Sequence, residues 1–189
     1  MNSIKNYVSC DRPTENPLRI GEARRILNKV FKEILSQSGF ALRKEQIDLA
    51  VHMLNEISKH GVTLAEAEVG TGKTLAYLVA AVIAKRGRLN DFWNTKLYPE
   101  MPYAEMSKMP IVIATSSIAL QKALITEYIP QLSVILIKHG VIDTPLTAVI
   151  RKGREHYALI SSGLSTERVD AASTITAFGL IAAIFSRTC

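Results

Sequence analysis

Residues 67–74 read Ala-Glu-Val-Gly-Thr-Gly-Lys-Thr, which places two glycines directly before a lysine and a threonine. Gly70 and Gly72 allow the main chain to curl tightly, so that its N–H groups can converge on an anion. The Lys73 ammonium can then reach phosphate oxygens, and the Thr74 hydroxyl can bind Mg²⁺. The stretch therefore predicts a phosphate-binding loop.

The flanking segments support this prediction. A short apolar strand is expected at 62–66 and an apolar helix at 75–85, so the loop lies between a strand and a helix, as a phosphate loop requires. Ala67 stands where the commoner pattern begins with glycine, which makes this the variant form [A/G]-x-x-G-x-G-K-T. The alternative, a chance glycine turn before a helix, is disfavoured by the length and context of the motif.

Apolar periodicity predicts the elements that position this loop. Helices are expected at 18–37, at 43–59 with Gly61 as its end, and at 118–128 with Pro130 as its stop. Continuous apolar runs predict a buried parallel strand at 110–115 and another strand at 146–150, whereas 87–109 reads as an irregular insertion. Strands that alternate with helices predict an α/β fold with a parallel sheet.

Composition narrows the class of protein. The 189 residues are 48% hydrophobic and 21% charged, which is typical of a globular chain. The net charge of +6 favours polyanionic partners such as nucleic acid. No signal peptide is visible at 1–16, and the apolar run 175–185 is too short to cross a bilayer. With only Cys10 and Cys189, far apart, we expect a cytoplasmic protein without a membrane partner.

Four segments, in order, carry a family resemblance. Arg43 to Gln46 has the form R-x-x-Q, and 66–77 looks like a helicase motif I. Ile113-Ala114-Thr115, followed by Leu120-Gln121, is similar to motif Ia, and 151–157 resembles K-G-R-x-N-Y. Together they resemble the first RecA-like domain of the DinG/XPD-like branch of superfamily 2 DNA helicases, which implies a P-loop NTPase fold with a partial RecA-like parallel sheet flanked by helices.

The resemblance implies a role for each matching residue. ATP with Mg²⁺ would be bound by the loop, with Gln46 reading adenine and Arg43 supporting that pocket. Single-stranded or forked DNA would be contacted at Thr115, Ser116 and Gln121 and along the basic run. The residues assigned to nucleotide are Arg43, Gln46, Ala67, Glu68, Val69, Gly70, Thr71, Gly72, Lys73 and Thr74; those assigned to DNA are Thr115, Ser116, Gln121, Arg151, Lys152 and Arg154.

Plainer interpretations stay open for some of these residues. Gln46 could be an ordinary solvated helix residue, and Ser116 or Ser117 could simply cap the following helix. Arg151, Lys152 and Arg154 could form a solvated face.

Two departures from the family limit what the chain is expected to do. Leu159 stands where many relatives have the first cysteine ligand of an iron–sulfur cluster, so no cluster is expected. The chain has no adjacent Asp-Glu pair to activate water, and no room for the second RecA-like lobe, which normally supplies an arginine finger. We expect ATP binding but no unaided strand separation, with the C-terminal helicase portion missing.

The expected organisation has three parts: a lead-in and helix at 1–39, a partial helicase ATP-binding domain at 40–158, and an atypical tail at 159–189. For the tail we favour a frameshift or premature stop over a deliberately shortened chain or a divergent tail that packs as a helix. Three functions remain in view: the ATP-binding segment of a DNA helicase, a truncated fragment that binds nucleotide or DNA without turnover, and a different P-loop ATPase.

Overall fold

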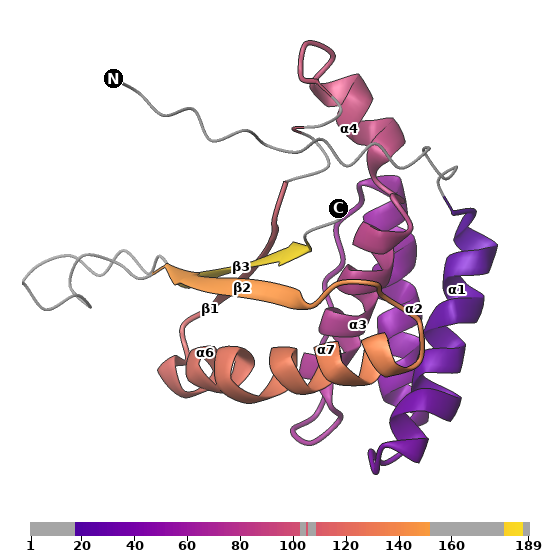
Figure 1. Ribbon diagram of the computed structural model, residues 1–189, viewed down its shortest axis with the longest axis vertical. Coiled ribbons are helices and arrows are strands. Elements are labelled where there is room, and N and C mark those ends of the chain that lie inside the picture. The colour runs from indigo at the N-terminus through magenta and orange to yellow at the C-terminus, as the bar shows by residue number, and fades with distance from the viewer. Residues whose placement is uncertain (1–17, 103–104, 106–108, 152–179, 187–189) are drawn as a thin grey trace, which may run out of the picture.

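The computed structural model describes residues 18–102, 105, 109–151 and 180–186 (Figure 1). Helices α1, α2 and α3 pack together, and a small sheet lies beside them with a long helical run along one side. The elements are α1 (Ile20–Lys29), the π-helical η1 (Val30–Leu35), α2 (Lys44–Lys59), α3 (Lys73–Arg86), α4 (Asp91–Leu97), β1 (Ile111–Thr115), α6 (Ile118–Ala123), the π-helical η2 (Leu124–Tyr128), α7 (Ile129–Lys138), β2 (Leu146–Arg151) and β3 (Leu180–Ser186).

Helix α3 forms the centre of the core. Every residue from Leu75 to Ala84 is buried apart from Tyr77, which is half-buried. A helix that is apolar on all sides must be covered on all sides, and α1 and α2 pack against it. The expected helices at 18–37, 43–59 and 75–85 are thus confirmed within a residue or two.

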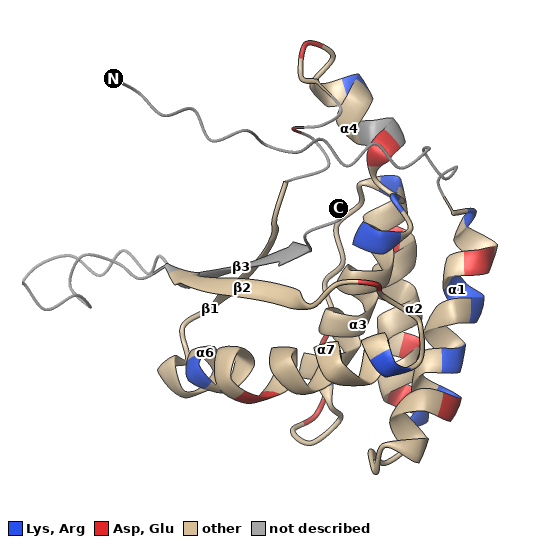
Figure 2. Cartoon of the chain, viewed as in Figure 1, with Lys and Arg blue, Asp and Glu red and all other residues tan. Residues whose placement is uncertain are grey.

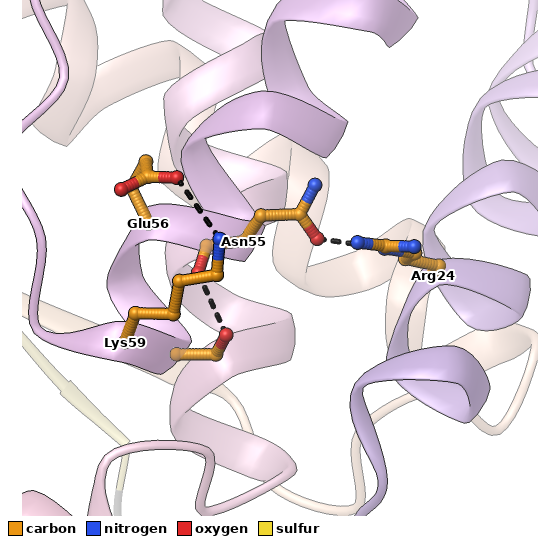
Figure 3. A network of polar contacts seen from close by, with 5 residues as sticks. Arg24, Asn55, Glu56 and Lys59 are labelled. Carbon is orange, nitrogen blue, oxygen red and sulfur yellow. Dashed lines mark hydrogen bonds and ion pairs between the residues drawn. The ribbon is translucent and has the colours of Figure 1, made fainter.

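A polar connection fixes α1 against α2 (Figure 3). The Arg24 Nε donates a 2.6 Å hydrogen bond to the Asn55 Oδ1 across the helix pair. The Ser58 hydroxyl donates to the Asn55 carbonyl at 2.7 Å, and Lys59 forms a 3.6 Å ion pair with Glu56. These contacts lie towards the C-terminal end of α2, so they leave its N-terminal end available for contact with the glycine loop.

The sheet has the strand order β1-β3-β2. β3 pairs antiparallel with both neighbours, with Ile113 opposite Ala182 and Ala148 opposite Ile184. β1 and β2 therefore run in the same direction without pairing to each other. The expected strands at 110–115 and 146–150 are confirmed, but the expected parallel sheet is wrong, because apolar periodicity identifies strands and not the direction in which they pair.

β1 is also less buried than its apolar sequence indicated. Ile111 and Ile113 pack against the core, whereas Val112 between them is 53% exposed. In β2, Ala148 packs against the core and Val149 is 44% exposed. The described helices thus cover one face of each strand, and the prediction of a strand buried on both faces is wrong.

The helix after β1 continues through the residue that was expected to stop it. α6, η2 and α7 follow without a break from Ile118 to Lys138. Pro130 lies at the start of α7, directly after the π-helical turns of η2. Because the regular α-helical ladder restarts at that point, the missing N–H of the proline interrupts no established ladder. Ser133 of α7 accepts a 2.9 Å hydrogen bond from the Leu146 N–H and so fixes β2.

Four further expectations are corrected. Residues 62–66 form no strand, and Val62 and Leu64 are 86% and 95% exposed, because no described strand pairs with them. The segment expected to be irregular at 87–109 contains α4. α2 ends at Lys59, and His60, with a left-handed φ of 58°, is its C-cap in the place expected for Gly61. Within the tail, 180–186 is a strand, so a purely helical tail is wrong there.

Candidate nucleotide-binding site

The glycine loop runs directly into the N-terminus of α3. Gly70 and Gly72 have φ angles of 89° and 84°, in the left-handed region where a side chain would be strained. Between them, the Thr71 N–H donates to the Glu68 carbonyl at 3.3 Å and its hydroxyl donates to the same oxygen at 2.7 Å. The loop is therefore a closed turn, as the two glycines predicted, although the strand expected before it is absent.

The start of α3 supplies hydrogen-bond donors to whatever the loop encloses. Gly72 is the N-cap, and no side chain caps the helix there. The first N–H groups of a helix have no partner within the helix, and the helix dipole adds positive charge at this end. The first turn of α3 contains no acidic residue. This end of α3 is thus electrostatically suited to an anion.

The Lys73 side chain folds back over the loop. Its ammonium donates to the main-chain carbonyls of Ala67 and Glu68, the second at 2.7 Å. The ammonium therefore lies against the loop, and these hydrogen bonds are made to the loop itself. An incoming anion would compete with these two carbonyls for the ammonium.

Two residues of the R-x-x-Q segment contact the loop from the side of α2. The Arg43 guanidinium donates to the Gly70 carbonyl, and the Gln46 Nε2 donates to the Gly72 carbonyl at 2.7 Å. Gln46 is only 5% exposed, so it is not the solvated helix residue of the plainer interpretation. A Cβ at Gly72 would collide with the Gln46 amide, which gives that glycine a second reason besides its φ angle.

Tyr77 places a hydroxyl one helical turn beyond Thr74. Its oxygen is buried and makes no hydrogen bond of normal geometry. Burial raises the pKa of Tyr77 above its ordinary value of 10.0; the neighbouring Thr74 side chain acts in the opposite direction, and Tyr128 adds to the increase. Sequence reasoning missed Tyr77, although it interrupts the otherwise apolar run of α3 at helical spacing from Thr74.

The residues expected to contact DNA are arranged around the end of β1. The Ser117 hydroxyl accepts from the Leu120 N–H at 3.2 Å and is the N-cap of α6, which confirms the capping interpretation for Ser117. Ser116 is exposed and Thr115 half-buried. Gln121 is only 6% exposed, and its amide donates to the Thr115 carbonyl at 3.0 Å. Gln121 thus holds the end of β1 from inside, while Ser116 faces solvent.

The basic run is described only at its first residue. Arg151 ends β2, whereas Lys152 and Arg154 lie outside the described residues. Elsewhere, Figure 2 shows Lys and Arg recurring along α1 and η1, where the acidic residues are Glu22 and Glu33. Within the part of the chain that the structure describes, no group of three or more His, Cys, Asp or Glu side chains could hold a metal, and no helix is long and apolar enough to cross a membrane.

Comparison with known proteins finds similarity to one protein named as a helicase and to one named as an exonuclease. The chain is 45% identical over 56 residues to the probable ATP-dependent helicase YpvA of Bacillus subtilis (strain 168), across 30% of this chain and 9% of that protein. It is 28% identical over 129 residues to the 3'-5' exonuclease DinG of the same organism, across 68% of this chain and 11% of that protein. No protein-family profile and no solved structure matches the chain.

These similarities support a relationship with DinG-like helicases. The matched regions cover only 9% and 11% of the two relatives. The chain therefore corresponds to a small part of either protein.

Proposed function

We propose that the chain is the N-terminal ATP-binding segment of a DinG-like, ATP-dependent DNA helicase, with part of a P-loop NTPase fold. The observation that carries the proposal is the closed glycine turn at the N-terminus of α3, with Lys73 folded over it. The similarity to YpvA and DinG supports the same conclusion.

The nucleotide would be held by its phosphates. Free N–H groups at the start of α3 would bind the phosphate oxygens, and Lys73 would exchange the Ala67 and Glu68 carbonyls for them. The exchange is favourable because a charged phosphate oxygen is a stronger acceptor for an ammonium than a neutral carbonyl. The Thr74 hydroxyl, in the first turn of α3, would bind Mg²⁺. The donors present thus fit an Mg²⁺–triphosphate.

DNA would be contacted at the C-terminal ends of β1 and β2. Thr115 and Ser116 would donate hydroxyls to the backbone of a single strand, and Arg151, Lys152 and Arg154 would contribute charge. Gln121, which was expected to touch DNA itself, would instead hold the Thr115 carbonyl in place for this contact.

Turnover is not expected from this chain. In hydrolysing relatives an Asp-Glu pair holds Mg²⁺ and polarises water, and the sequence has no such adjacent pair. In an intact helicase, bound ATP would supply the free energy that moves DNA. This chain would bind the nucleotide without hydrolysing it. In this respect the proposal agrees with the second candidate function, a non-catalytic fragment that binds nucleotide and DNA.

The test is calorimetric titration of the full chain with ATP in the presence of Mg²⁺, together with a steady-state assay for phosphate release. We expect saturable binding, competition by ADP and no sustained release of phosphate. Failure to bind either nucleotide would overturn the proposal. Sustained turnover by this chain alone would instead favour a different P-loop ATPase.

A further inference from the structure

Two donors from α2 hold two carbonyls of the glycine loop. The Arg43 guanidinium bonds the Gly70 oxygen and the Gln46 amide bonds the Gly72 oxygen, over sequence separations of 27 and 26 residues. Both donors lie at the start of α2, where Arg43 is the N-cap. The start of α2 is therefore fastened to the start of α3 through the loop.

Gln46 lies at a position of α2 where its side chain could cap the helix. Gln46 is the third residue after the N-cap, where a glutamine side chain commonly turns back to cap its own helix. No side-chain hydrogen bond caps this end of α2, whereas the Gln46 Nε2 donates to Gly72 of the loop. The residues just before it, Arg43 to Glu45, are exposed while Gln46 is buried, so Gln46 contacts the loop and does not cap α2.

Fixing these carbonyls also fixes the N–H groups that follow them. A peptide unit is planar and trans, so the oxygen and the next N–H point in opposite directions. With the Gly72 oxygen held by Gln46, and also accepting from the Ala76 N–H at 3.2 Å, the Lys73 N–H is directed away from α2. The Gly70 oxygen, held by Arg43, sets the Thr71 N–H in the same way, and that N–H donates to the Glu68 carbonyl and so closes the turn.

We propose that Arg43 and Gln46 are positioning residues for the phosphate loop, and that they act on the bound triphosphate through the Gly70 and Gly72 carbonyls. This inference rests on the proposed nucleotide binding. The Gln46 amide is only 5% exposed and donates one of its two N–H groups to the Gly72 carbonyl, so it is turned towards the loop. These two residues therefore favour the binding of Mg²⁺–polyphosphate, whichever nucleobase it carries.

The experiment compares three ligands on the full chain: Mg²⁺–ATP, Mg²⁺–GTP and Mg²⁺–tripolyphosphate, by calorimetry. We expect Gln46→Ala and Arg43→Ala to weaken all three by the same factor, about tenfold for one hydrogen bond to the loop. Arg43→Lys, which keeps the charge and a donor, should recover part of the loss. Lys44→Ala, at the exposed neighbour of Arg43, is the matched control and should leave all three affinities unchanged.

The outcomes separate this inference from the proposed function. If Gln46→Ala weakens ATP but not tripolyphosphate, Gln46 acts on the base and the inference is overturned while nucleotide binding stands. If every variant binds the three ligands as tightly as the wild-type chain does, the inference is also overturned, while nucleotide binding stands. If the wild-type chain binds none of the three ligands, the proposed function fails as well. Because Arg43 is exposed, its variants test the inference even if Gln46→Ala does not fold.

Discussion

The Gln46 side-chain amide donates a 2.7 Å hydrogen bond to the Gly72 main-chain carbonyl, and so joins the N-terminus of α2 to that of α3. Gln46 is buried, and a side chain at Gly72 would be strained by the φ angle of 84° and would displace the Gln46 amide. The segment that resembles an adenine motif is thus, in this structure, part of the wall that shapes the phosphate loop.

Removal of the Thr74 hydroxyl should affect metal-dependent binding alone. In Thr74→Ala we expect Mg²⁺–ATP to bind about tenfold more weakly, while ATP measured in EDTA is unchanged, because the lost group is a metal ligand. Thr71→Ala is the contrasting variant: its hydroxyl closes the turn onto Glu68, so its loss should weaken both forms alike. Equal losses with and without metal in Thr74→Ala would remove Thr74 from the Mg²⁺ site.

The buried hydroxyl of Tyr77 predicts a stability change at alkaline pH. Because its folded pKa is raised above 10.0, folding favours the neutral phenol; this contribution is fully present below the unfolded pKa and is lost as pH rises through the folded pKa. Alkaline titration of tyrosinate absorbance should show a late-ionising group that disappears in Tyr77→Phe. Tyr98→Phe, at an exposed tyrosine, should keep that late phase; if it is the variant that loses the phase, Tyr77 is not its source.

Packing around α3 should dominate the stability of the described core. Leu78 is completely buried in α3, so Leu78→Ala should lower the free energy of unfolding by about 2–5 kcal/mol, measured by urea denaturation. Val134→Ala, at a valine 67% exposed on α7, should change it by less than about 0.5 kcal/mol. Similar losses in the two variants would contradict the placement of α3 at the centre of the core.

Sequence patterns predicted the local features of this protein better than the long-range ones. The turn at Gly70 and Gly72 and the helix from Lys73 follow from conformational preferences of neighbouring residues, and both are present. The apolar periodicity at 18–37 and 43–59 likewise predicted the helices α1, η1 and α2. Local signals also failed at Pro130, because the preceding π-helical turns change the ladder that a proline would otherwise break.

Pairing between distant segments could not be predicted in the same way. Nothing in β1 or β2 specifies that β3 should lie between them and run antiparallel to both. The partners of Arg43 and Gln46 lie 27 and 26 residues away, so the resemblance indicated that the two residues matter without indicating the carbonyls that they bind. At Val62 and Leu64 the apolar sequence predicted a strand, but no described strand pairs with this segment and both side chains are exposed.

Binding of single-stranded DNA should depend strongly on salt. Each phosphate contact releases condensed counterions, so the logarithm of affinity should fall with the logarithm of salt concentration, by about 0.7 per contact on a single strand. Arg151→Ala should reduce this slope by about one contact, whereas Arg25→Ala, on the exposed face of α1, should leave it unchanged. Fluorescence anisotropy with a labelled oligonucleotide measures the slope, and a flat salt response would argue against the DNA contact.

The central claim, that residues 67–74 bind the phosphates of ATP, is tested most directly by the affinity of Lys73→Ala for Mg²⁺–ATP. Lys59→Ala is the matched control, because it removes a lysine that is 69% exposed and paired only at the surface of α2. By calorimetry on folded protein, Lys73→Ala should lose at least about tenfold in affinity and Lys59→Ala should bind like the wild type. Equal ATP affinity in Lys73→Ala and the wild type would contradict the claim.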